Sequence, residues 1–220
     1  WVQVGADIDG AAAGDGSGYS VSMSADGQTV AIGSAFHDSN KGHVRVYNYT
    51  GGSWVQVGAD IDGEAANDYS GSSVSLSDNG TILTVGAYQN DGNGNLSGHT
   101  RVYEYSGGSW SQIGSDIDGE AAEDRSGFNV SLSDDGSRFV TGAPFNDDGA
   151  TNGGQARIYE ISTPPSSAAD FNAVTGSTIG TVTASAARNI SGTAAQVKAA
   201  LVTDPVALAV ASTVTVSDGL

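Results

Sequence analysis

Residues 1–10 read WVQVGADIDG, and the same phrase returns at residues 54–63 as WVQVGADIDG and at residues 110–119 as WSQIGSDIDG. The copies begin at Trp1, Trp54 and Trp110, so the repeat has a period of 53 to 56 residues. Self-similarity at this spacing is typical of propeller blades and solenoid units. We therefore expect a residue that is present in all three copies to have a structural role in the repeat.

Every copy carries the same order of strand and turn signals. In the second copy, alternating polar and apolar side chains at residues 73–77 predict a half-buried strand, and Asp78-Asn79-Gly80 predicts a tight turn after it. Three more strands are expected in this copy, over residues 82–86, 100–105 and 110–114. Four short antiparallel strands in a unit of this length form one propeller blade.

The other copies give equivalent strands, over residues 20–24, 29–33 and 43–49, and over residues 129–133, 138–142 and 155–161. The predicted fold class is all-β, with four-stranded β-propeller blades at residues 1–53, 54–109 and 110–163. Residues 1–5 are predicted as a fourth strand that has no blade before it. Because propellers usually have four to eight blades, we expect further repeats upstream or other copies of the chain to close the ring, and we favour upstream repeats.

The segments SGYSV at residues 17–21, SGFNV at residues 126–130 and GAP at residues 142–144 resemble FG-GAP repeats, the blades of integrin-alpha-like propellers. The resemblance covers roughly residues 1–163 and implies that each copy is a blade. In that family a calcium loop of the Asp-x-Asn-x-Asp-Gly type lies between the first two strands. Here the stretch is shortened to a turn such as SDNG at residues 77–80, so the family's calcium site is not carried over.

The acidic loop after each phrase offers a different metal candidate. Carboxylates at alternating positions around a glycine can wrap Ca²⁺, which takes six to eight oxygen ligands. The predicted calcium ligands are Asp60, Asp62, Glu64, Asp68, Asp116, Asp118, Glu120 and Asp124. The first copy keeps Asp7, Asp9 and Asp15 but has Ala11 in place of the Glu. The alternative is that these Asp residues form turns by accepting hydrogen bonds from backbone N–H groups.

Other repeated side chains are given structural roles. Arg45, Arg101 and Arg157 share one position, and we expect each to pair with the acidic loop of a neighbouring blade. The Trp residues are expected to pack between blades rather than to stack on sugars. The histidines His37, His43 and His99 are not expected to recur as a set, and no Ser-His-Asp arrangement is evident, so no catalytic residue is proposed.

The composition limits the partners. The 220 residues include 25 acidic and 8 basic side chains, a net charge of −17, and no cysteine. A field of this sign repels nucleic acid and anionic membranes, and no apolar run approaches the roughly 18 residues of a membrane helix. We therefore expect no nucleic-acid binding, no membrane insertion and no disulfide. Because the chain starts at Trp1 rather than Met, we expect it to be a piece of a longer protein.

The composition changes at residues 164–167, PPSS, which we interpret as a linker. The segment 168–220 is rich in Ala, Thr and Val. Capping-box patterns at residues 167–170 and 193–196 predict two short helices, and Thr/Val alternation predicts a strand after each, at residues 178–184 and 206–216. This small α/β repeat resembles repeats of giant secreted proteins of marine bacteria, especially cyanobacteria, and of their phages.

Together these features predict a non-catalytic extracellular or cell-surface protein, a propeller on a repetitive stalk that serves structure or adhesion. Its expected partners are further copies of itself, in filaments or surface layers, or cell-surface proteins and glycans. Two alternatives stay open. One is an appendage protein of a phage virion, and the other is a carbohydrate-active or sugar-binding propeller.

Overall fold

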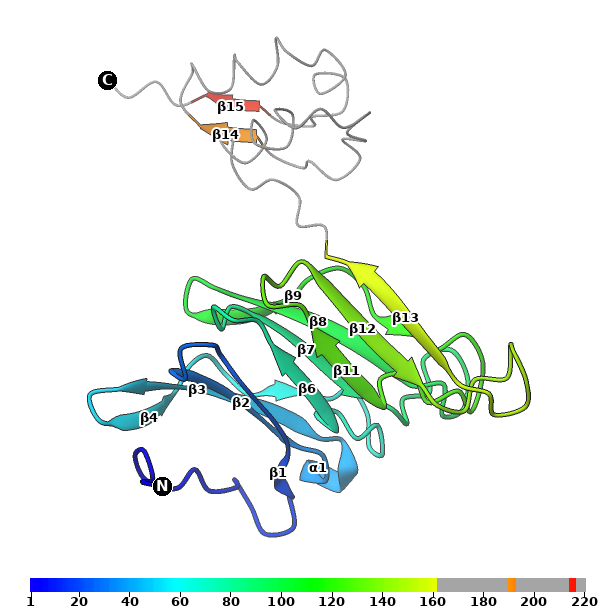
Figure 1. Ribbon diagram of the computed structural model, residues 1–220, viewed down its shortest axis with the longest axis horizontal. Coiled ribbons are helices and arrows are strands. Elements are labelled where there is room, and N and C mark those ends of the chain that lie inside the picture. The colour runs from blue at the N-terminus through cyan, green and yellow to red at the C-terminus, as the bar shows by residue number, and fades with distance from the viewer. Residues whose placement is uncertain (162–189, 193–213, 217–220) are drawn as a thin grey trace. The chain divides into compact units, whose positions relative to one another are not determined.

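The computed structural model describes residues 1–161, 190–192 and 214–216, and the chain divides into two units, Trp1–Ile161 and Ser162–Leu220. The first unit is nearly all β, with antiparallel sheets and one short helix, α1 (His37–Asn40) (Figure 1). No helix in the described residues is long and apolar enough to cross a membrane.

The three repeats form three successive sheets, as the period predicted. The first sheet contains β1 (Ser17–Met23), β2 (Thr29–Ser34), β3 (His43–Thr50) and β4 (Ser53–Gln56) in that order. The second contains β6 (Ser73–Leu76), β7 (Ile82–Ala87), β8 (His99–Ser106) and β9 (Ser109–Gln112). The third contains β11 (Asn129–Leu132), β12 (Arg138–Ala143) and β13 (Gln155–Glu160).

The repeated phrase differs from its prediction in two ways. Residues 1–5, predicted as a strand, have no strand structure, because no third strand of a preceding blade lies beside them. In contrast, the end of the phrase forms two-residue strands that the sequence pattern missed: β5 (Ile61–Asp62) pairs with β3, and β10 (Ile117–Asp118) pairs with β8.

The turn between the first two strands of each blade has the same chemistry three times. The hydroxyls of Ser24, Ser77 and Ser133 donate to the side chains of Asp26, Asn79 and Asp135, at 2.6, 2.8 and 2.6 Å. Each turn ends in a glycine with φ near +70°, a conformation that other residues rarely adopt. The local sequence therefore determines these hairpins.

The blades stack through an apolar core and through serine hydroxyls. The core between the first and second blades includes Val44 and Val46 on one side and Val74 and Leu76 on the other. At its edge, Leu76 N donates to Ser22 Oγ at 2.9 Å, and the same contact recurs from the third blade to Ser73 and Ser75 of the second. The blades thus repeat one mode of contact.

Successive copies of the phrase also contact one another. Trp54 Nε1 donates to the carbonyl of Val4 at 2.9 Å, and Trp110 Nε1 donates to the carbonyl of Val57 at 3.1 Å. A Cβ atom at Gly58, whose φ is +77°, would lie 2.7 Å from Trp110. The expected packing of the tryptophans between repeats is therefore confirmed for Trp54 and Trp110.

Little of the second unit is described. β14 (Ile190–Gly192) pairs in parallel with β15 (Val214–Val216), which lies inside the strand predicted at residues 206–216. The linker at residues 164–167, both predicted helices and the strand predicted at residues 178–184 lie outside the described residues.

Candidate functional site

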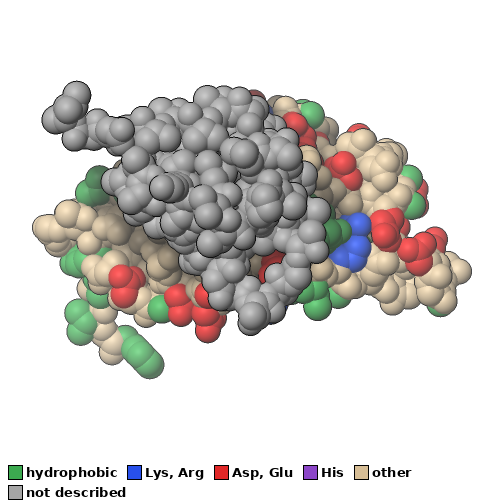
Figure 2. Space-filling view, turned by 90° about the horizontal axis from the view of Figure 1, so that it is seen from above, with side chains coloured by type: hydrophobic (Ala, Val, Ile, Leu, Met, Phe, Trp, Pro, Cys, Tyr) green, Lys and Arg blue, Asp and Glu red, His purple; other side chains and the backbone are tan. Residues whose placement is uncertain are grey.

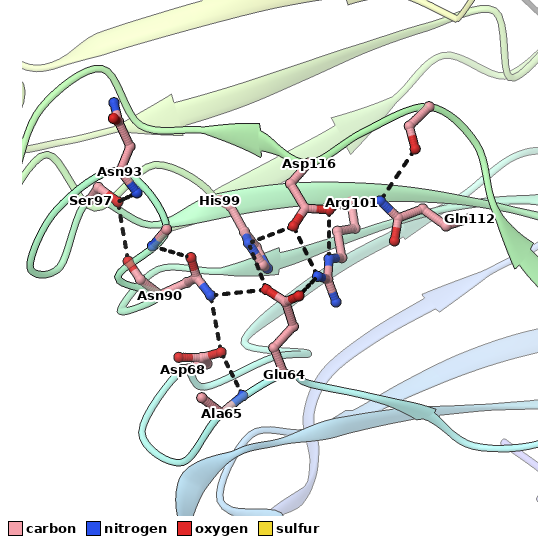
Figure 3. A network of polar contacts seen from close by, with 12 residues as sticks. Glu64, Ala65, Asp68, Asn90, Asn93, Ser97, His99, Arg101, Gln112 and Asp116 are labelled. Carbon is pink, nitrogen blue, oxygen red and sulfur yellow. Dashed lines mark hydrogen bonds and ion pairs between the residues drawn. The ribbon is translucent and has the colours of Figure 1, made fainter.

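The polar side chains of the second blade meet around Arg101 on β8 (Figure 3). Its Nε and Nη2 donate to the two carboxylate oxygens of Asp116, each at 2.9 Å, and Nη2 also pairs with Glu64. Gln112 Nε2 donates to Asp116 Oδ1 at 2.7 Å. Glu64 lies in the loop that enters the second blade and Asp116 in the loop that leaves it, so Arg101 holds both loops to one strand.

Asn90 and Asp68 extend this network. Asn90 Nδ2 donates to Asp68 Oδ2 at 3.0 Å and to Glu64 Oε2 at 3.4 Å. The buried Asp68 also accepts a hydrogen bond from Ala65 N at 3.0 Å. The carboxylate of Asp68 therefore stabilises the turn in which it lies, as the turn-forming alternative expected.

His99 is buried beside the same ion pairs. Its Nδ1 lies 3.9 Å from Glu64 Oε2 and 3.8 Å from Asp116 Oδ2. Burial lowers the pKa of His99, and the charge of Arg101 lowers it further. The neutral imidazole is therefore the favoured form in this blade. The guanidinium hydrogen bonds in turn hold the pKa of Asp116 below its usual value.

His43 and His99 occupy the same position in their blades. They begin β3 and β8, and pair in register with Ser34 and Ala87. The three histidines do not recur as a set, but this pair does recur, and the shared patterns HVRVY at residues 43–47 and HTRVY at residues 99–103 carried the signal. The third blade has Gln155 at this position.

Each blade also pairs a buried Asp with a residue 22 positions later, and the pairs are Asp15–His37, Asp68–Asn90 and Asp124–Asn146. In the second and third blades, the Asn amide donates to the carboxylate at 3.0 Å. In the first blade, His37 Nδ1 lies 3.1 Å from Asp15 Oδ2. The first blade thus has an imidazole where the others have an amide.

The remaining predicted calcium ligands have separate contacts. Asp60 accepts a hydrogen bond from Gln56 at 2.6 Å, and Asp62 lies in β5 opposite His43. The carbonyl of Asp118 accepts a hydrogen bond from Arg157 at 2.7 Å, and Glu120 lies 3.7 Å from the same guanidinium. Arg45 donates to the carbonyl of Asp9 at 2.7 Å, so each of the three repeated arginines contacts an acidic loop.

Two groups of potential metal ligands lie within the described residues. They are Asp15, His37 and His43 in the first blade, and Glu64, His99 and Asp116 in the second, and the ligand atoms of each group lie within 4.8 Å of one another. Both include imidazole nitrogen, whereas Ca²⁺ prefers oxygen ligands. Calcium binding by the predicted set of eight carboxylates stays a prediction.

A shallow hollow of about 240 Å³ lies beside the first phrase. Its lining includes the rings of Tyr47 and Trp54 and the acidic residues Asp7 and Asp9. Aromatic faces next to polar groups suit small polar ligands, but the volume is below the roughly 300–1,000 Å³ of typical ligand pockets.

The family comparison supports the repeat assignment. The model of the FG-GAP repeat family matches residues 59–103, which run from the acidic loop that enters the second blade into β8. An FG-GAP repeat is therefore present in the second blade. The match does not reach residues 164–220, so the resemblance expected for that segment stays a prediction.

Comparisons with whole proteins do not indicate an activity for this chain. No curated protein sequence matches the chain. Among solved structures, the chain is similar to a putative 6-phosphogluconolactonase from Bacteroides uniformis, with 16% identity and a TM-score of 0.45 over 65% of this chain. It is also similar to Kuenenia stuttgartiensis hydrazine synthase, with 13% identity and a TM-score of 0.43 over 73% of this chain. The chain spans 36% of each of those two chains, and neither similarity supports an inference about activity.

Proposed function

We propose that the chain is a non-catalytic structural or adhesion protein that acts outside the cell, and that its blades assemble with further blades of the same kind. The observation that carries this proposal is that the first and third blades expose the surfaces that blades bury between one another. Acidic side chains are scattered over the coloured part of the face in Figure 2, in keeping with the net charge of −17, and a high net charge favours solubility.

The outer face of the first blade is apolar. Val21 and Met23 on β1 are 63% and 55% exposed. Their equivalents in the second blade, Val74 and Leu76, are only 8% and 7% exposed because they pack against the first blade. The first blade therefore presents the side chains with which the second blade makes its contact.

The third blade presents the opposite half of the same contact. Ile158 on β13 is 75% exposed, whereas its equivalents Val46 and Val102 are 1% and 3% exposed. Val46 and Val102 lie in the cores that join each blade to the next one. The two end faces are therefore complementary to each other, which is the arrangement required for head-to-tail association.

Mass measurement in solution tests this assembly. We expect the full chain to self-associate with increasing concentration in light scattering, and Val21→Asp and Ile158→Asp each to abolish association. A 1:1 mixture of these two variants should form dimers only, because each keeps the end face that the other has lost. Val55→Asp is the matched control, since Val55 is 51% exposed but lies on β4. A chain that stays monomeric at all concentrations would contradict self-assembly.

A second candidate function is sugar binding at the hollow beside Tyr47 and Trp54, which has the aromatic and acidic groups that carbohydrate sites use. A glycan array with the full chain and with Asp7→Ala tests it, and binding should weaken in the variant. Turnover of any bound glycan would contradict the non-catalytic assignment.

A further inference from the structure

Three segments of the first blade bring Asp15, His37 and His43 together. Asp15 follows the first phrase, His37 lies in α1 and His43 begins β3. One ligand atom from each lies within 4.8 Å of the others, and His37 Nδ1 is 3.1 Å from Asp15 Oδ2. The two imidazole rings stack, with centroids 4.0 Å apart and an angle of 22° between their planes.

The buried imidazole of His43 lacks hydrogen-bond partners. Its side chain is fully buried, and among the described residues neither Nδ1 nor Nε2 makes a hydrogen bond. His37 Nδ1 is also buried, and its approach to Asp15 does not have hydrogen-bond geometry. Buried polar atoms are nearly always satisfied, so such nitrogens beside a carboxylate indicate that a ligand supplies the missing interaction.

Comparison of the blades shows how this group differs from its equivalents. Where the second blade has Asn90, the first has His37, and where the second has Glu64, the first has Ala11. The first change adds a nitrogen ligand, and the second removes the carboxylate that pairs with Arg101 in the second blade. These changes leave two imidazoles and one carboxylate whose ligand atoms lie within 4.8 Å of one another.

We propose that Asp15, His37 and His43 bind a divalent transition-metal ion, with Zn²⁺ as the best fit. Imidazole nitrogen and carboxylate oxygen are the ligands that Zn²⁺ takes in three-residue sites, and a water completes the tetrahedron. Asp60 Oδ2 lies 3.6 Å from His43 Nδ1, just beyond hydrogen-bond distance, and a small approach on metal binding would let this carboxylate orient the imidazole from behind.

Binding requires a small rearrangement. Bonds of about 2.0–2.1 Å in a tetrahedron place the ligand atoms about 3.4 Å apart. His37 Nδ1 and Asp15 Oδ2 are 3.1 Å apart and the ligand atoms of the group lie within 4.8 Å of one another, so only small adjustments of the separations are needed. The stacked rings must also tilt, because parallel rings cannot direct their lone pairs at one ion. Metal binding is therefore expected to shift the ring signals of His37 and His43 in NMR spectra and to leave those of His99 unchanged.

The chain itself supplies replacements that suit the fold. His37→Asn introduces the residue of positions 90 and 146, and His43→Gln introduces the residue of position 155. Each removes one proposed ligand and keeps a side chain that another blade accommodates. His99→Gln is the matched control, since it makes the same change in the second blade and removes a member of the other candidate group.

The test is calorimetric titration of the tag-free full chain with Zn²⁺, with Co²⁺ as an absorbance probe of tetrahedral geometry. We expect one ion per chain, and at least a tenfold loss of affinity in His37→Asn and in His43→Gln with none in His99→Gln. Excess Ca²⁺ should not compete. The proposal is overturned if the wild type does not bind Zn²⁺ at micromolar concentrations, or if His37→Asn binds Zn²⁺ as tightly as the wild type. Loss of binding in His99→Gln alone would move the site to the second blade.

Discussion

The first and second blades have the same strands but carry different polar side chains at equivalent positions. In the second blade, the buried His99 lies beside the carboxylates of Glu64 and Asp116, which Arg101 neutralises. In the first blade, the buried His43 lies against a second imidazole, and neither of its nitrogens makes a hydrogen bond within the described residues, whereas in His99 this holds for Nδ1. The two blades thus share their strands, while two substitutions replace a structural ion-pair network by a candidate ligand site.

The largest effect is expected from removal of the central guanidinium. Arg101→Met leaves Glu64 and Asp116 without their partner, and we expect a loss of about 2 kcal/mol in the free energy of unfolding, below the value for fully buried pairs because Glu64 is half-exposed. Arg45→Met is the control in the first blade, where the guanidinium bonds only a carbonyl, and it should cost less than about 1 kcal/mol. Urea denaturation measures both, and equal losses would contradict the difference between the blades.

The same network predicts sensitivity to acid. Because the hydrogen bonds of Arg101 lower the pKa of Asp116 below its unfolded value of 3.8, the carboxylate stabilises the fold above about pH 4 and loses this contribution as the pH falls toward its native pKa. Between pH 5 and pH 3 the wild type should therefore lose more stability than Asp116→Asn. Thermal melts at each pH measure this loss. Parallel acid profiles would show that the ion pair contributes nothing.

Introducing residues of the first blade into the second blade should create a second metal site there. Glu64→Ala with Asn90→His gives the second blade the Ala, His and His arrangement of Ala11, His37 and His43. If the proposed metal site is correct, the double variant should bind two Zn²⁺ ions per chain by calorimetry. Glu64→Ala alone is the control and should bind one, and a stoichiometry of one in the double variant would show that more than these residues is needed.

The smallest effect is expected where the blades agree. Asn79 holds the second turn as Asp26 holds the first, so Asn79→Asp should change the melting temperature at pH 7 by no more than about 2 °C. The hydrogen bond from Ser24 lowers the pKa of Asp26, and the new carboxylate should likewise make the variant slightly less stable than the wild type below pH 4. A large change at pH 7 would indicate that the turns are not equivalent.

Local sequence patterns predicted most of the fold. The strands around Val74 and Val130, for example, follow from the alternation of polar and apolar side chains, and the turn at Asp78-Asn79-Gly80 follows from residues that favour positive φ. β5 and β10 were missed because two residues are too few to show alternation. Each forms only because the chain turns back to pair with an earlier strand, β3 for β5 and β8 for β10.

The candidate site was only partly predictable. The sequence identified the acidic loops and the repeated arginines, and the equivalence of His43 and His99 was present in the patterns HVRVY and HTRVY. It did not indicate that His37 would reach His43, since the loop that joins them is shorter than the equivalent loops of the other two blades. Such contacts depend on where a loop folds over its sheet.

The sequence by itself determined the number of repeats, the order of their strands and the turns between them, because these depend on residues close together in the chain. Only the tertiary structure decided which polar side chains meet. Arg101 contacts Glu64 across 37 positions, and Asp15 meets His37 across 22, because the acidic loop at the start of each repeat folds back beside later segments of the same blade. The packing of blades also decides which face of β1 stays exposed, although its alternation matches that of the buried β6.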